Sequence, residues 1–159
     1  MNAGIVPLLL LSLTVGLMLA FVPTRRATIA SVVFAATAFL SFWVPLGLAP
    51  NMIFTGLWLT MIVAAILVYL PVAKWSIAAL PICLSAGYWL GACAGLSNDL
   101  TALVIGILPL FISFPARWLT VRKFGIAVKI VASWMIAIAS LSVFLTLIPT
   151  PGYKPDHME

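Results

Sequence analysis

The sequence predicts an all-α, polytopic membrane protein, with about six transmembrane helices in one bundle and both termini non-cytoplasmic. Of its 159 residues, 65% are hydrophobic and only 7% are charged, whereas soluble domains carry about 25% charged residues. The apolar runs are continuous and about 20 residues long, which is the length of a membrane-spanning helix. They lack the alternation of apolar and polar residues that is typical of barrel strands.

The limits of each helix follow from the turns between the apolar runs. We expect helices over 4–22, 27–49, 52–72, 76–95, 100–116 and 124–148, separated by turns at 23–26, 50–51, 74–75, 96–99 and 117–123. No basic residue precedes the first run, so we expect a retained helix and not a cleaved signal peptide. Residues 149–159 are polar and contain three prolines, which predicts a disordered tail.

The basic residues predict how the bundle lies in the membrane. Seven of them fall on one side of the expected spans: Arg25, Arg26, Lys74, Arg117, Arg122, Lys123 and Lys129. Lys154 falls on the other side, together with Asp99, Asp156 and Glu159. The positive-inside rule makes the first side cytoplasmic, and we expect a bacterial plasma (inner) membrane. Topology explains the net charge of +5, and we expect no nucleic acid partner.

Three glycines predict a helix-packing seam. Gly87, Gly91 and Gly95 are spaced four residues apart, so they share one helix face in a glycine-zipper pattern that another backbone can approach closely. We expect the helix over 76–95 to be the central one. Its partner is either a helix of the same chain or a second protein, which would be another membrane protein or a second copy bound by self-association.

Two prolines and four basic residues are further candidate sites. Pro81 and Pro109 fall inside expected helices, where each can produce a kink. Arg117, Arg122, Lys123 and Lys129 can contact lipid headgroups, or simply mark an ordinary cytoplasmic turn. Lys129 falls within a span, where it either extends its amine to the headgroups or has a buried function. Asp99 suits the N-cap of the next helix.

The sequence contains no recognisable catalytic, cofactor or metal site. Its one histidine, His157, lies in the tail, and no acidic residue falls in a span. Cys83 and Cys93 are ten residues apart in one expected helix, about 15 Å along its axis, which is too far for a disulfide. One histidine outside the spans excludes bis-histidine haem ligation, and the lack of a Cys/His cluster in the sequence excludes zinc and iron–sulfur sites. We therefore expect no enzyme, cofactor or metal.

Three functions fit these properties. The first is a non-catalytic accessory or anchoring subunit of a larger membrane complex. The alternative is a small-solute channel or transporter, built as a homo-oligomer, whose path would be lined by hydroxyl groups at Thr55, Thr60, Ser76, Ser85, Ser113, Ser133 and Ser140. A lipid-handling protein that uses the basic turn is a third option.

An aromatic residue, a proline and a base recur in three of the turns. This recurrence indicates either that the chain consists of three repeated helical hairpins, or that these residue types all favour turns at the membrane interface.

Overall fold

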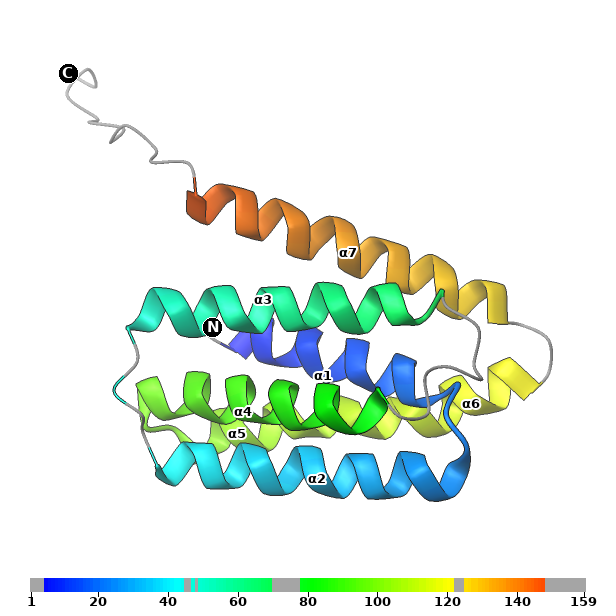
Figure 1. Ribbon diagram of the computed structural model, residues 1–159, viewed down its shortest axis with the longest axis horizontal. Coiled ribbons are helices and arrows are strands. Elements are labelled where there is room, and N and C mark those ends of the chain that lie inside the picture. Colours follow the sequence, from blue (N-terminus) through cyan, green and yellow to red (C-terminus); the bar gives the residue numbers. More distant parts are fainter. Residues whose placement is uncertain (1–4, 45–46, 48, 70–77, 122–124, 148–159) are drawn as a thin grey trace, which may run out of the picture.

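The structure is a computed structural model that describes residues 5–44, 47, 49–69, 78–121 and 125–147. These residues form helices and no strand. The helices are α1 (Ile5–Leu19), α2 (Thr24–Trp43), α3 (Pro50–Leu67), α4 (Ala79–Ser97), α5 (Leu100–Ile107), the 3₁₀ helix η2 (Leu108–Ile112), α6 (Ser113–Val121) and α7 (Gly125–Leu147). Figure 1 shows them as one bundle of roughly parallel and antiparallel rods.

The predicted membrane bundle is confirmed by the length and composition of these helices. Within the described ranges, five segments are long and apolar enough to cross a bilayer, and the shorter α1 is also apolar. One of the five is the continuous segment formed by α5, η2 and α6. The described spans are therefore close to those expected from the apolar runs, and the chain is all-α.

Several helix ends differ from their expected positions, and the largest difference is at the end of α2, which lies at Trp43 and not at 49. α2 begins at Thr24 and not at 27, so Arg25 and Arg26 lie in its first turn. α6 continues to Val121, five residues beyond the expected end at 116, so Arg117 lies inside a helix and not in a turn. Basic residues reach the headgroups from the ends of helices as well as from loops, because their long side chains extend along the helix surface.

The central helix is α1, not α4 as the glycine pattern predicted. α1 contacts α3, α4, α5, η2, α6 and α7, and nine of its 15 residues are buried. Figure 1 shows it in the middle of the bundle, with α3 and α7 on one side and α2 on the other. α1 is apolar around its whole circumference, which suits a helix surrounded by others. α4 also contacts α1, α3 and α5, but its most extensive contact is with α2.

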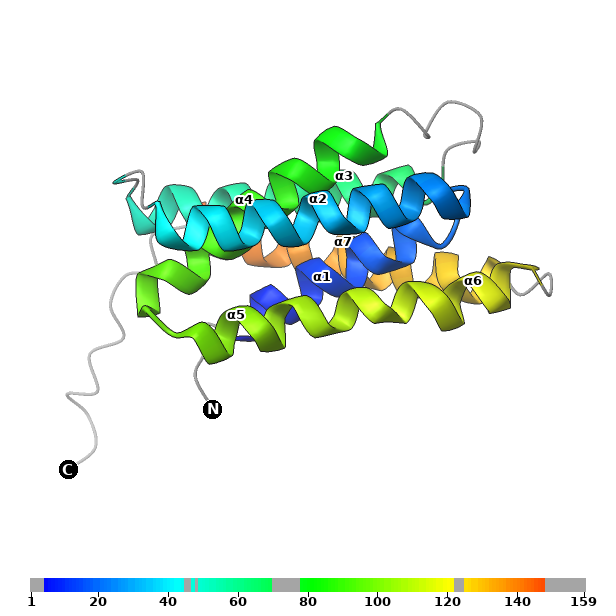
Figure 2. The same ribbon diagram turned by 90° about the horizontal axis from the view of Figure 1, so that it is seen from below.

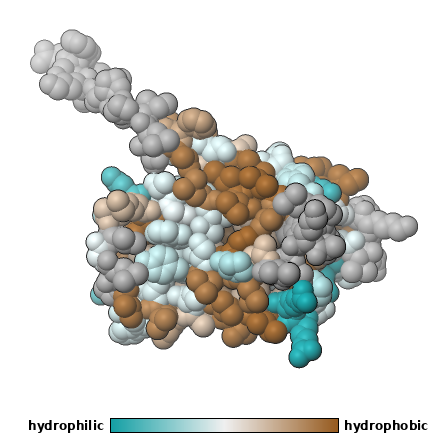
Figure 3. All heavy atoms as spheres, viewed as in Figure 1, coloured by the Kyte–Doolittle hydropathy of each residue, from teal (hydrophilic) through white to brown (hydrophobic). Residues whose placement is uncertain are grey.

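The described charges lie at opposite ends of the bundle. α1 begins and α7 ends at one end, where Asp99 also lies, and Figure 1 shows the α1–α2 turn at the other end. Arg25, Arg26, Arg117 and Lys129 belong to this second end, which we call the basic end. Figure 3 shows the most hydrophilic side chains gathered toward the two ends of the molecule. Lys74, Arg122, Lys123, Lys154 and the predicted tail lie outside the described residues.

Candidate functional site

The glycine face of α4 packs against α2 of the same chain. A Cβ atom added to Gly87 would overlap the Phe34 carbonyl oxygen, and one added to Gly91 would overlap the Ala38 carbonyl oxygen. The Ser41 hydroxyl then donates a hydrogen bond to the Tyr88 carbonyl across the interface, at 3.0 Å. We call this contact the α2–α4 seam. It is an approach of backbone to backbone, which only glycine permits.

The third glycine lies at the loose end of the seam. A Cβ atom on Gly95 would be 3.4 Å from the Phe42 carbonyl oxygen, which is an ordinary van der Waals distance. The three glycines therefore differ, although their spacing makes them look equivalent. Because α2 covers the glycine face, self-association through that face would require α2 to leave it.

Pro109 interrupts, at mid-length, the span formed by α5, η2 and α6. It is the second residue of η2, which separates α5 from α6. Proline has no backbone N–H, so the carbonyl that would accept a bond from residue 109 loses its partner. In 3₁₀ geometry that carbonyl belongs to Gly106. The buried Ser12 hydroxyl of α1, which also lies 3.0 Å from the Leu8 carbonyl of its own helix, is the hydrogen-bond donor beside it. An unsatisfied carbonyl is costly in a bilayer, so Ser12 stabilises the break.

Gly16 brings α1 against the same break. A Cβ atom on Gly16 would be 3.2 Å from the Pro109 carbonyl oxygen and 3.3 Å from that of Leu110. Ser12 and Gly16 are one helical turn apart, so α1 places the Ser12 hydroxyl and the Gly16 position, which has no side chain, against η2. The sequence interpretation missed both residues, although their spacing is a small-xxx-small pattern.

Pro81 does not interrupt a helix. It is the third residue of α4, which begins at Ala79. The first backbone N–H groups of a helix have no partner within it, so proline there removes no helical hydrogen bond. The prediction of a kink at Pro81 is therefore wrong, because this proline lies in the first turn of α4. By contrast, the expected N-cap at Asp99 is confirmed, since its carboxylate accepts from the Thr101 N–H at 2.9 Å.

The hydroxyl groups that might line a solute path are dispersed. Thr55 and Thr60 donate to carbonyls of their own helix, those of Asn51 and Gly56. Thr60 and Ser85 approach each other at 3.3 Å between α3 and α4, whereas Ser133 is exposed on α7. Ser113 belongs to α6, Ser140 is half-buried, and Ser76 lies outside the described residues. The described members of this set do not form one polar path.

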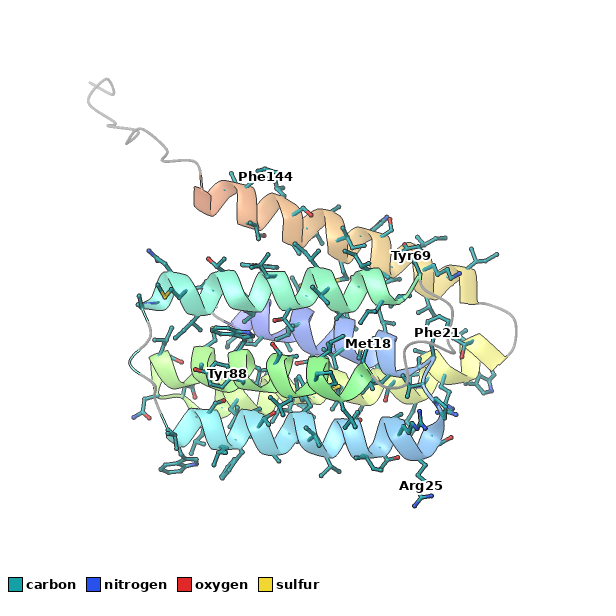
Figure 4. The ribbon with its side chains drawn as sticks, in the orientation of Figure 1. Met18, Phe21, Arg25, Tyr69, Tyr88 and Phe144 are labelled. Carbon is teal, nitrogen blue, oxygen red and sulfur yellow. The ribbon has the colours of Figure 1, made fainter. Side chains whose placement is uncertain are left out.

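The basic candidates have different environments. The Arg117 guanidinium donates from Nη1 to the Val22 carbonyl at 3.0 Å, which ties α6 to the α1–α2 turn. Lys129 is exposed, and its backbone carbonyl accepts from the Tyr69 hydroxyl at 2.6 Å. Figure 4 shows Tyr69 reaching toward α7 and Arg25 pointing away from the bundle. The side chain of Arg117 is therefore built into the fold.

Arg117 lies at one end of an apolar groove of about 320 Å³. We call it the α2–α6 groove, since α2 forms one wall and the α5–α6 segment forms the other. Figure 2 shows these two walls with α1 behind them. The lining residues are Leu19, Thr24, Ala27, Thr28, Ser31, Val32, Ala35, Ile107, Leu110, Phe111, Ser113, Phe114 and Arg117. The rings of Phe111 and Phe114 stack with their centroids 6.4 Å apart.

A second exposed region is the outward face of α7, which we define as Ile130, Ser133, Trp134, Ala137, Leu141 and Phe144. All six side chains are exposed, and Figure 4 shows Phe144 projecting away from the bundle. Trp134 is 68% exposed and lies about 14 Å from the start of the 23-residue helix. Within the described part of the chain, neither the Trp134 indole N–H nor the Ser133 hydroxyl forms a hydrogen bond.

The described residues contain no group of three His, Cys, Asp or Glu that could hold a metal ion. Cys83 and Cys93 are buried in α4 as free thiols. No protein-family model matches the chain, and the comparisons with the curated proteins and with the solved structures found no match.

Proposed function

We propose that this chain is a non-catalytic accessory subunit that anchors or stabilises a larger complex in the bacterial plasma membrane. It docks against another membrane protein through the outward face of α7. The partner contributes a transmembrane helix with a hydrogen-bond acceptor near its middle. Helices in lipid associate through close packing and hydrogen bonds, so such a helix matches what this face offers.

The observation that supports this proposal is the position of Trp134. Tryptophan in membrane proteins favours the two interfaces, where its indole N–H meets water or headgroups. Trp134 instead projects outward from the middle of α7. At that depth lipid offers its N–H no acceptor. A partner helix would provide one, and large aromatic side chains frequently dominate the binding energy of protein interfaces.

A comparison of two tryptophans tests the proposal. Trp43 is 62% exposed, close to Trp134 in accessibility, but it is the last residue of α2. The tagged protein is purified from its own host in mild detergent, and the mass of each complex is measured. We expect one membrane protein to be recovered stoichiometrically with the wild type and with Trp43→Ala, and to be lost with Trp134→Ala.

Site-specific crosslinking then locates the contact. A photo-crosslinker at position 133 is expected to label that same protein, because Ser133 neighbours Trp134 on the exposed face. A matched crosslinker at position 84 on α4, where Leu84 is 53% exposed, is expected not to label it. Recovery of the chain alone, as a monomer or homo-oligomer, would overturn the subunit role. Solute flux into liposomes would then become the relevant assay.

A further inference from the structure

We infer that the α2–α6 groove binds one acyl chain of an anionic phospholipid, whose phosphate contacts Arg117. The lipid belongs to the leaflet at the basic end. This site is separate from the α7 face, and the inference does not depend on the proposed function.

The first argument is the depth of the groove. Its walls run from Thr24 to Ala35 on α2 and from Arg117 back to Ile107 on the opposite side. These walls span 11 and 10 residue steps, which correspond to about 17 Å each once the steeper rise of the 3₁₀ helix η2 is included. That is close to half of the ~30 Å hydrocarbon thickness, or one leaflet. The groove therefore extends from the headgroup level to mid-bilayer, as one acyl chain does.

The second argument is the chemistry along the groove. Its deeper part is formed by apolar side chains such as Val32, Leu110 and Phe111. The hydroxyls of Thr28 and Ser31 donate to carbonyls of their own helix at 3.0 and 2.9 Å, so they present little unpaired polarity to a hydrocarbon chain. The remaining polar residues of the lining are Thr24, Ser113 and Arg117, and of these only Arg117, at the basic end, is charged.

The third argument is charge complementarity at the Arg117 end of the groove. The Arg117 side chain has five N–H donors, and within the described part of the chain one hydrogen bond, to Val22, is formed. That bond fixes the guanidinium at the mouth of the groove. Arginine binds phosphate oxygens in a planar, two-pronged geometry. Arg25 and Arg26 begin α2 at the same end, which adds positive charge around a headgroup.

The test compares phosphatidylglycerol, which is anionic, with phosphatidylcholine, which is zwitterionic. Each lipid is titrated into the purified protein, and bound lipid is counted by native mass spectrometry. We expect one phosphatidylglycerol to bind in preference to phosphatidylcholine. Arg117→Gln is expected to weaken it about fivefold. Lys129→Gln, which removes a base at the same end but outside the groove, is expected to leave it unchanged.

Two further variants separate the groove from general surface charge and from misfolding. Ala35→Phe fills the deep part of the groove without changing charge, and it is expected to weaken binding. Arg117→Lys keeps the charge, and it is expected to retain the preference for phosphatidylglycerol. Equal binding of both lipids would overturn the inference. So would equal losses in Arg117→Gln and Lys129→Gln, no loss in Ala35→Phe, or a loss in Arg117→Lys as large as that in Arg117→Gln.

Discussion

The two sides of α2 pack in opposite ways. Toward α4, the carbonyl oxygens of Phe34 and Ala38 approach glycines so closely that no methyl group fits between them. Toward α6, Ala35 lines a groove of about 320 Å³. α2 presents alanine to both sides, so its own residue size does not decide the distance. The neighbouring helix decides it, because α4 presents Gly91 whereas the opposite wall of the groove presents stacked phenylalanines.

This difference matters because lipid is as apolar as the side chains themselves. Between helices in a bilayer, the hydrophobic effect contributes little, and close packing and hydrogen bonds provide most of the attraction. The α2–α4 seam has both, since its backbones touch and Ser41 donates to Tyr88. The α2–α6 groove has little of either, so lipid fills it. A small residue therefore creates a tight contact only where the partner is also small.

The largest expected effect is loss of the seam in Gly91→Leu. Its Cβ atom would overlap the Ala38 carbonyl oxygen, and backbone cannot move aside as a flexible side chain can. We expect a loss of about 3 kcal/mol or more in the free energy of unfolding. Unfolding in mixed micelles, followed by circular dichroism, measures it.

Gly95→Ala provides a control at the loose end of the seam. Its added Cβ atom would lie at an ordinary contact distance of 3.4 Å, so we expect a change within about 0.5 kcal/mol. Normal stability of Gly91→Leu, or equal losses in both variants, would contradict the packing described for the seam.

An intermediate effect is expected where α1 compensates for the break at Pro109. Ser12→Ala removes the donor to the Gly106 carbonyl and leaves that carbonyl buried in the bundle. We expect a loss of about 1 kcal/mol in the free energy of unfolding, since hydrogen bonds between membrane helices contribute on the order of 0.6 to 1.7 kcal/mol.

Ser142→Ala is the control for this prediction. The Ser142 hydroxyl donates only to the Ile138 carbonyl of its own helix, at 2.9 Å in an exposed position. Removing it should change the stability by less than about 0.3 kcal/mol. Similar losses in the two variants would show that Ser12 contributes nothing specific to the break.

Properties that depend on one segment at a time were predictable from the sequence. The apolar runs predicted the spans because a bilayer requires a helix of fixed length, and Pro109 lies in a break because proline lacks the N–H. The four described bases of the predicted set, Arg25, Arg26, Arg117 and Lys129, lie at one end of the bundle, because each belongs to the end of a span on that side. These rules involve no contact between helices.

Properties that depend on pairs of helices were not predictable. The glycine spacing indicated a close contact but not that α2 would make it, and it led us to expect α4 at the centre instead of α1. α1, α3, α4 and α7 are predominantly apolar on every side, so their sequences carry no clear periodicity that separates a lipid-facing surface from a buried one. Gly56 illustrates this: it packs against the Trp89 ring, and nothing in its local sequence indicates that contact.

The smallest expected effect gives the sharpest comparison, since it uses the same substitution on both sides of α2. Ala35 and Ala38 are three residues apart; Ala38 is fully buried beside Gly91, whereas Ala35 lines the groove. Ala35→Leu extends into space that lipid otherwise occupies, so we expect its stability to change by less than about 0.5 kcal/mol. Ala38→Leu inserts the same atoms into the seam and should lose about 1–3 kcal/mol. Chemical unfolding of both variants in one micelle composition measures the difference. Equal losses would mean that α2 packs as tightly toward α6 as toward α4, and the groove would then be closed in the membrane.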